Sequence, residues 1–288
     1  MRNESSARDP VFIGGLRSGT TIVCTLISAH SRYAELPELQ FQSHNGGLSD
    51  LLAGRTTMER FVERMKGWYY RTPPARPPGL DALVSREVLD VILESFASSF
   101  ASRPVETSRA LILSLVEPRM RATGKASWVE GTPTTTTAAS ALHELLPEAR
   151  FVHMVRDGRD AVGSLRRRGW GPHDVGKAVR WWGDRLRLAE QQRRAIPPDR
   201  FCAIDLADLV LDDRDSSYRR LLEFLGVNDE PPMRSFFETR VGAEPAHIGA
   251  WREELPRAER DELESAYASV LVGLRRDSVS LVPGAVAR

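Results

Sequence analysis

The sequence predicts an α/β fold in which a parallel sheet is flanked by helices, a P-loop-like arrangement. Three observations support this prediction. Short apolar runs alternate with helical patterns along much of the chain, the first apolar run ends in a glycine-rich turn, and a later run ends in a charged turn. Repeated strand-then-helix units favour parallel strands covered on both faces, and ligands of such sheets bind outside the carboxyl ends of the strands.

The first element is the apolar run at residues 11–13, which is expected to form a short buried strand over residues 11–14, and a glycine-rich turn continues to residue 19. Glycine lets backbone amides approach an anion closely and adopts positive φ without strain. A helix is expected over residues 18–29, and its free N-terminal amides would face the same ligand. We therefore predict an anion-binding turn; a strand-to-helix turn without a ligand is the structural alternative.

The spacing of this turn is that of the phosphate-binding loop of nucleotide enzymes, with one difference. Gly14 and Gly19 stand five positions apart and are followed by Thr20 and Thr21, but Thr20 occupies the place of the usual lysine. The cation lies within the loop instead, as Arg17. Because an ordinary NTPase needs that lysine together with Mg²⁺, the loop is predicted to hold a phosphate ester with little or no metal.

The second informative element is the apolar run at residues 150–155, which again leads into a charged turn and a helix. Arg156 ends the run and Ser164 follows eight positions later. A guanidinium fork and a hydroxyl at this spacing suit one phosphate group. Asp157 and Asp160 suit the capped first turn of the helix. For Arg156 alone, a surface ion pair is the alternative role.

The remaining elements complete the alternation. Two further strands are expected over residues 126–129 and 200–204, and further helices over residues 135–145, 159–167 and 176–195. We interpret residues 1–288 as a single domain, because the length suffices for one large core and no linker divides it.

Residues 48–121, called the insertion below, are predicted to be mostly helical and to lie on the acceptor side of the site. A proline-rich loop at residues 71–79 lies inside it. The insertion also carries a cluster of large side chains: Phe61, Met65, Trp68, Tyr69 and Tyr70. An apolar helix face of this kind is more often core, so the core role is favoured over a pocket wall.

Composition excludes several classes of protein. The 40 Lys and Arg residues against 39 Asp and Glu give a net charge of +1, which predicts attachment to neither nucleic acid nor membrane. The charge is uneven, however: residues 150–194 hold 12 basic and 5 acidic residues, as a multiply anionic ligand requires. No nucleic-acid recognition module is visible.

Cys24 and Cys202 lack metal-ligand spacing and are expected to be reduced core residues. The first residues lack an apolar signal region, and no apolar run reaches the ~18 residues of a membrane span. The expectation is a soluble cytoplasmic protein without a metal.

Together, the two phosphate-binding segments resemble the sulfotransferase family that uses 3′-phosphoadenosine-5′-phosphosulfate (PAPS) as sulfuryl donor. Residues 17–21, Arg-Ser-Gly-Thr-Thr, are similar to the loop that holds the 5′-phosphosulfate in that family, and Arg156 with Ser164 matches its 3′-phosphate pair. The RSGTT and RDGR forms are nearer the tyrosylprotein and bacterial small-molecule branches. Residues 209–226 and 248–252 continue the similarity, and the latter resemble the family's element that closes over the 3′-phosphate end.

The resemblance implies a set of site residues. Those expected to bind PAPS are Gly15, Arg17, Ser18, Gly19, Thr20, Thr21, Arg156, Ser164, Arg168, Trp251 and Arg252. Arg17 is also expected to act in catalysis, together with a carboxylate that serves as general base. The acceptor is expected to be a small molecule or natural product with a hydroxyl group.

Two positions depart from the family pattern. Gly131 stands where many members carry a catalytic lysine, so charge stabilisation would fall to Arg17, to helix amides or to another cation. Leu206 replaces a tyrosine that lies near the adenosine in the family. A non-catalytic relative that binds PAPS or another nucleotide is therefore an alternative, and a P-loop kinase or NTPase is a weaker one.

Three residues are candidates for the general base. Glu38 is the first choice, because it follows Arg17 by 21 positions, the offset of the base in the tyrosylprotein branch. Glu130, beside Gly131, is the second. His44 is the third, since histidine is a common base but a lone histidine is more often a structural residue.

Overall fold

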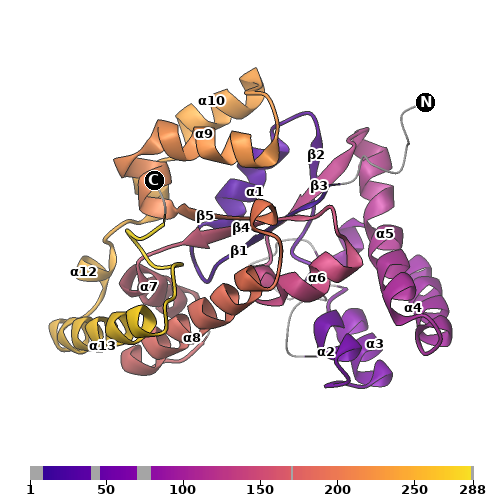
Figure 1. Cartoon of the computed structure of the whole chain (residues 1–288), viewed down its shortest axis with the longest axis horizontal. Helices are drawn as coiled ribbons and strands as arrows, with labels where there is room; N and C mark the ends of the chain where they lie inside the picture. The colour runs from indigo at the N-terminus through magenta and orange to yellow at the C-terminus, as the bar shows by residue number, and fades with distance from the viewer. Residues whose placement is uncertain (1–8, 40–45, 70–78, 170, 287–288) are drawn as a thin grey trace.

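The computed structural model describes residues 9–39, 46–69, 79–169 and 171–286. Its centre is a parallel five-stranded sheet with the order β2-β3-β1-β4-β5 (Figure 1). The strands are β1 (Val11–Gly14), β2 (Tyr33–Glu35), β3 (Ser127–Glu130), β4 (Arg150–Val155) and β5 (Phe201–Asp205). The α/β prediction is confirmed.

The helices account for most of the remaining described residues. They are α1 (Thr20–Ser28), α2 (Leu48–Leu52), α3 (Met58–Gly67), α4 (Arg86–Phe100), α5 (Pro104–Thr123), α6 (Ala139–Leu145), α7 (Gly158–Arg168), α8 (Val175–Arg194), α9 (Arg214–Leu225), α10 (Pro231–Arg240), α11 (Ala243–Ala246), α12 (Trp251–Glu254) and α13 (Arg257–Arg276). A short 3₁₀ turn, Thr135–Ala138, precedes α6, where the sequence predicts continuous helix.

Alternation of side chains along each strand divides the core into two clusters. In β1, Val11 and Ile13 pack on one face with α1, α9 and α10, whereas Phe12 packs on the other face with α6, α7 and α8. Figure 1 shows these two groups of helices on opposite sides of the sheet. Successive side chains of a strand point to opposite faces, so both faces of this sheet are buried.

The sequence pattern did not predict β2. This strand has three residues and lies at the edge of the sheet, where it pairs only with β3 among the described strands. Three residues that end in Glu35 contain too little alternation to be recognised, and the pairing with β3 decides the conformation. Strand β2 sets the position of the residues that follow it, Glu38 included.

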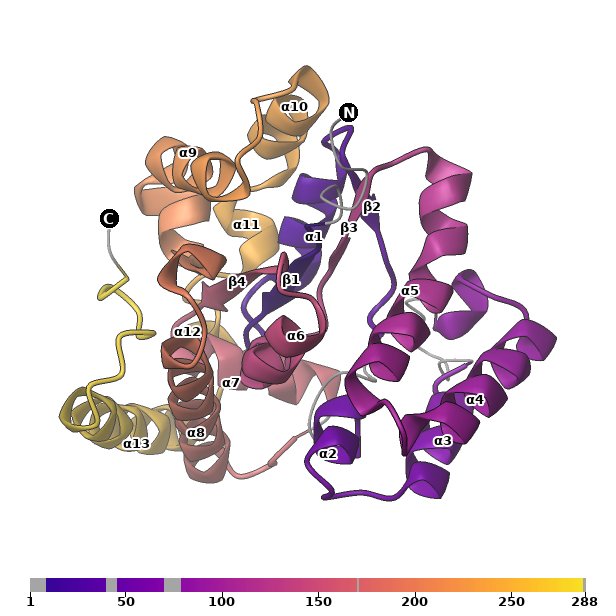
Figure 2. The same cartoon turned by 45° about the vertical axis from the view of Figure 1, so that its right-hand side comes forward.

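The insertion lies beside the β2 edge of the sheet (Figure 2). Phe61, Met65 and Tyr69 are buried in its core, so the core interpretation of the aromatic cluster is confirmed for these three. Trp68 is half-buried. Tyr70 and most of the proline-rich loop lie outside the described residues.

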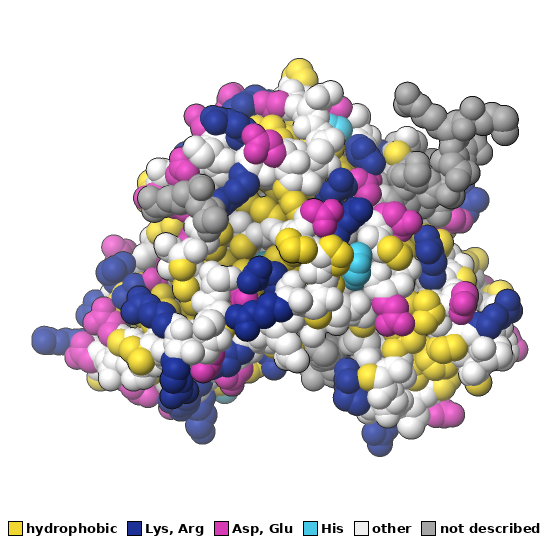
Figure 3. Space-filling view, in the orientation of Figure 1, with side chains coloured by type: hydrophobic (Ala, Val, Ile, Leu, Met, Phe, Trp, Pro, Cys, Tyr) yellow, Lys and Arg dark blue, Asp and Glu magenta, His cyan; other side chains and the backbone are white. Residues whose placement is uncertain are grey.

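Both cysteines are free; Cys24 is buried and Cys202 is half-buried. Figure 3 shows Lys and Arg side chains interspersed with Asp and Glu over one face of the molecule, in keeping with the net charge of +1. Among the described residues, no helix has the length and apolar character needed to cross a membrane.

Candidate functional site

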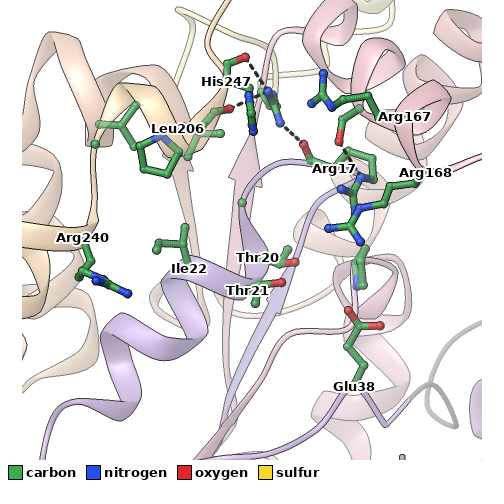
Figure 4. Close-up of a pocket in the computed structure, with 18 residues that line it drawn as sticks. Arg17, Thr20, Thr21, Ile22, Glu38, Arg167, Arg168, Leu206, Arg240 and His247 are labelled. Carbon is green, nitrogen blue, oxygen red and sulfur yellow. Dashed lines mark hydrogen bonds between the residues drawn. The ribbon is translucent and has the colours of Figure 1, made fainter. Parts of the chain in front are cut away.

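A pocket of about 270 Å³ opens at the carboxyl edge of the sheet (Figure 4). Segments that follow all five strands contribute to its lining: Arg17 after β1, Glu38 after β2, Pro133 after β3, Arg156 after β4 and Leu206 after β5. Parallel strands bring their carboxyl ends to one edge, so residues far apart in the sequence meet here.

The loop after β1 leads directly into α1. Gly19 caps this helix in the left-handed conformation, with φ of 84°, and no side chain occupies the cap. Thr20 and Thr21 line the pocket at the first turn. The amides of that turn are therefore available to an anion, and the positive end of the helix dipole favours one.

Gly15 and Ser18 are buried at the base of the same loop. The Gly15 amide donates to the Pro133 carbonyl (2.8 Å), and a Cβ on Gly15 would lie 2.2 Å from the Met154 carbonyl oxygen. Two reasons therefore favour glycine at this position: a side chain would clash with the Met154 carbonyl, and the backbone φ is 130°, a conformation that other residues rarely adopt. Ser18 is 1% exposed. These two residues shape the loop, and their contact with PAPS stays a prediction.

Arg17 joins the two phosphate-binding segments. Its Nε donates to Ser164 Oγ (3.0 Å), and its carbonyl accepts from Arg156 Nη1 (2.9 Å). Arg156 Nη2 also donates to the carbonyls of Ala246 (2.8 Å) and His247 (3.0 Å). The sequence predicts that Arg156 and Ser164 converge on one phosphate, and the structure places both of them in the pocket lining together with Arg17.

The pocket lining is strongly cationic. It contains Glu38 and five arginines, namely Arg17, Arg156, Arg167, Arg168 and Arg240. Burial, followed by repulsion from Arg168 and Arg156, lowers the pKa of Arg17 from its ordinary value, and Glu38 acts in the opposite direction. An anionic ligand would relieve this repulsion.

Three lining residues with ionisable side chains were missed from the sequence: Arg167, Arg240 and His247. Arg167 belongs to a run of three arginines at residues 166–168, which is the one signal that could have indicated it. Arg240 ends α10 and His247 follows α11, so only the packing of these helices brings them to the pocket.

Trp251 and Arg252 lie outside the lining of the pocket as described. Trp251 is 2% exposed, and the guanidiniums of Arg159 and Arg252 each lie 4.8 Å from its ring centroid. Asp157 caps α7 as predicted, by accepting from the Arg159 amide. Asp160 accepts instead from the Gly249 amide (2.8 Å) and so anchors the segment before Trp251. Contact of Trp251 and Arg252 with PAPS stays a prediction.

The two candidate carboxylates have different environments. Glu130 is 0% exposed, and its Oε1 accepts from the amides of Leu39 (3.0 Å) and Thr132 (2.9 Å) and from the Thr132 hydroxyl. Its Oε2 accepts from the Thr135 hydroxyl (3.1 Å). Burial raises the pKa of Glu130 to about 7, although these hydrogen bonds oppose the change. Glu130 is thus part of the protein interior.

Glu38, by contrast, lines the pocket, and Figure 4 shows its carboxylate directed toward Arg17 and Arg168. This position is open to an acceptor, which the interior position of Glu130 is not. Of these two carboxylates, Glu38 is therefore the one that a ligand in the pocket could reach. The third candidate, His44, lies outside the described residues.

Gly131 has a packing role. A Cβ at this position would lie 2.4 Å from Cys24 Sγ of α1. A side chain here would force the Cys24 side chain or α1 to shift, and α1 contributes residues to the pocket lining. Close contact between the segment after β3 and α1 thus accounts for the glycine.

Part of the pocket lining is apolar. Leu206, Ile22 and Val210 contribute apolar side chains, and Leu206 Cδ1 would lie 3.0 Å from a Cβ on Gly19. The pocket therefore combines arginine side chains with apolar ones. No group of three or more His, Cys, Asp or Glu side chains that could hold a metal occurs within the described part of the chain.

The fold and this pocket define a parallel α/β protein with an arginine-lined pocket at the carboxyl edge of its sheet. Residues 10–231 match the model of the sulfotransferase family, so the chain belongs to that family. Sulfuryl transfer is the chemistry that this membership supports.

One relative is the protein-tyrosine sulfotransferase of Drosophila melanogaster, which is 25% identical over 225 residues. The match covers 75% of this chain and 38% of that protein, so the chain spans well under half of its relative's length.

Solved structures support the fold. The sulfotransferase domain of the Synechococcus PCC 7002 olefin synthase matches with a TM-score of 0.53 at 17% identity, covering 94% of this chain and 98% of that domain. Sulfotransferase STF9 from Mycobacterium avium matches with a TM-score of 0.50 at 16% identity, covering 93% of this chain and 77% of that protein's chain. Both share the α/β sulfotransferase fold with this chain.

Glu130 predicts a pH dependence of stability. The folded protein holds its proton more tightly than the unfolded chain does, because burial raises the pKa to about 7. The stabilisation that the protonated Glu130 contributes is therefore complete below the pKa of the unfolded chain, about 4.3, and is lost as the pH rises through the pKa of the folded protein, about 7. Between about pH 4.5 and about pH 7.5, the wild type should lose on the order of 2–3 kcal/mol of unfolding free energy relative to Glu130→Gln.

Urea denaturation of both proteins at the two pH values measures this difference. His153, whose pKa burial lowers to about 4, is present in both proteins and cancels in the comparison. If the difference in unfolding free energy between the wild type and Glu130→Gln is the same at both pH values, Glu130 stays ionised in the folded protein.

Proposed function

We propose that this protein transfers the sulfuryl group of PAPS to a hydroxyl group of an acceptor, and that the acceptor is a small molecule or natural product. The observation that carries this proposal is the placement of one carboxylate, Glu38, across a pocket lined by five arginines. Such a pocket suits a highly anionic donor on one side and a proton acceptor on the other.

The residues present fit PAPS. The amides of the first turn of α1, with Arg17, would hold the 5′-phosphosulfate. Arg156 and Ser164 would hold the 3′-phosphate. Arg156 Nε is buried with no hydrogen-bond partner in the described structure, and Ser164 accepts from Arg17 with its own hydroxyl proton left to donate. Leu206 and Ile22 would contact the apolar part of the donor.

PAPS supplies the sulfuryl group and leaves as 3′-phosphoadenosine-5′-phosphate (PAP). Glu38 takes the proton of the acceptor hydroxyl as the acceptor oxygen bonds to sulfur. Arg17 and the first-turn amides of α1 stabilise the negative charge that grows on the departing phosphate oxygen as its bond to sulfur breaks. Arg17 then serves in place of the lysine that many family members carry where this chain has Gly131.

The protein is expected to bind PAP more tightly than ATP, and without Mg²⁺, because ATP lacks a 3′-phosphate for Arg156 and Ser164. Isothermal titration calorimetry measures both affinities. Ser164→Ala should weaken PAP binding by roughly 1.5–3 kcal/mol. Binding of adenosine 5′-phosphosulfate, which also lacks the 3′-phosphate, should change much less and serves as the control. Equal affinity for PAP and ATP, or strict dependence on Mg²⁺, would contradict the proposal and favour the kinase alternative.

Arg17→Ala is expected to lower kcat on the order of 10²–10³-fold, as removal of one oxyanion donor does. The donor KM should change less, because the departing oxygen carries more charge in the transition state than in the ground state. Steady-state kinetics with labelled PAPS measures both constants. The control is Arg166→Ala, whose guanidinium bonds to Glu259 and the His173 carbonyl. A raised KM with unchanged kcat would show that Arg17 only binds the donor.

Glu38→Gln is expected to lower kcat by about 10²–10⁴-fold, the usual contribution of a general base, while PAP affinity is retained. The acceptor used is the one that the wild type sulfates fastest among phenols, aliphatic alcohols and tyrosine-containing peptides. A phenolic or peptide preference would place this protein nearer its Drosophila relative. Full activity of Glu38→Gln would remove Glu38 as the base, and no turnover of any acceptor by the wild type would favour the non-catalytic alternative.

A further inference from the structure

We propose that Trp68 and Glu130 are positioning residues that hold the peptide group between Glu38 and Leu39 from opposite sides. The inference rests on the proposed function, in which Glu38 is the general base. Trp68 Nε1 donates to the Glu38 carbonyl (2.9 Å), and the Leu39 amide donates to Glu130 Oε1 (3.0 Å). The two bonds thus engage the oxygen and the N–H of the same peptide group, which point in opposite directions in a trans peptide.

The residues around this peptide group are also held. Leu36, directly after β2, donates its amide to the Val129 carbonyl of β3 (3.0 Å). Leu36 and Leu39 are both buried in the core, and Leu39 is 1% exposed. Glu38 therefore projects into the pocket from a backbone whose neighbours on both sides are fixed, and its carboxylate has only side-chain torsions left to vary.

The insertion provides a firm base for Trp68. Trp68 caps α3, and its amide donates to the Arg64 carbonyl (2.9 Å). The next residue, Tyr69, donates its buried hydroxyl to the Val84 carbonyl (3.1 Å), and its own carbonyl accepts from the Asp81 amide (3.2 Å). Trp68 is thus anchored in the helical insertion, and its indole N–H reaches the backbone of Glu38, the proposed general base.

Glu130 joins the segment after β2 to the segment after β3. Its Oε1 accepts from the amides of both Leu39 and Thr132, and its Oε2 meets the Thr135 hydroxyl. A glutamine keeps the Oε1 acceptor, and its amide NH₂ can donate to the Thr135 hydroxyl, which is able to accept. A leucine of similar size leaves the amides of Leu39 and Thr132 without this acceptor.

The bonds assign the insertion a role in the reaction itself. Its helices would set the orientation of the base toward the acceptor through Trp68, in addition to forming part of the acceptor side. Misplacement of a reacting group by about 1 Å can cost on the order of 10²-fold in rate, so loss of either hydrogen bond should appear in kcat.

A double-mutant cycle between Trp68→Phe and Glu38→Gln tests the inference. Trp68→Phe keeps the ring and removes the N–H donor. It should lower kcat by about 10–100-fold with PAP affinity unchanged, and should cause little further loss in the Glu38→Gln protein. The control is Trp181→Phe, a half-buried tryptophan of α8 outside the pocket lining, which should leave kcat unchanged.

The Glu130 side is tested by kcat and by hydrogen exchange of the Leu39 amide, measured by NMR. Glu130→Leu should lower kcat and speed exchange of this amide by about tenfold or more, and Glu130→Gln should restore both toward wild type. The exchange measurement does not depend on turnover.

The outcomes separate this inference from the proposed function. Independent, additive losses for Trp68→Phe and Glu38→Gln, or a parallel loss of PAP affinity, would overturn the positioning role and leave Glu38 as the base. Rapid exchange of the Leu39 amide in the wild type would also overturn it. Wild-type activity of Glu38→Gln would instead overturn the assignment of the base.

Discussion

The parallel alignment of the five strands is the constraint on which the site depends. Because β1 lies in the centre of the sheet between β3 and β4, the loop after it meets the segments that follow both neighbours. Arg156 links these segments directly, because its guanidinium donates to a carbonyl of the loop after β1 and to carbonyls of the segment around α11. A change of strand order would separate these groups.

The second feature of the site is the electrostatic repulsion between its grouped arginines. Burial and mutual repulsion lower the pKa of Arg17, and the pKa of Arg156 is lowered mainly by burial. A ligand with several negative charges, such as the donor that we propose, would offset this repulsion. Gly131 contributes no cation to this edge of the sheet, and the arginines of the pocket come from other segments, among them the loop after β1 and α7.

Glu38 and Glu130 illustrate how environment divides the roles of two carboxylates at one edge of a sheet. Glu130 accepts hydrogen bonds from the segments after β2 and β3 and is fully buried. Glu38 lines the cationic pocket. The buried Glu130 accepts a hydrogen bond from the amide of Leu39, the residue that follows Glu38. The buried position of Glu130 suits structural support, whereas the proton transfer that we propose for Glu38 requires contact with the pocket.

The sequence by itself determined the parts of this protein that depend on local chemistry. Strands β1 and β4 have the predicted bounds, because each is an apolar run ended by a glycine or a charge, and the loop at Arg17 was recognisable from its glycines and hydroxyls. Only the tertiary structure decided the strand β2, the entry of Arg240 and His247 into the pocket, and the bond from Trp68 to Glu38. These features arise from pairing and packing between segments distant in the chain, and no local pattern of residues encodes which distant partner a strand edge, a helix end or an indole N–H will meet.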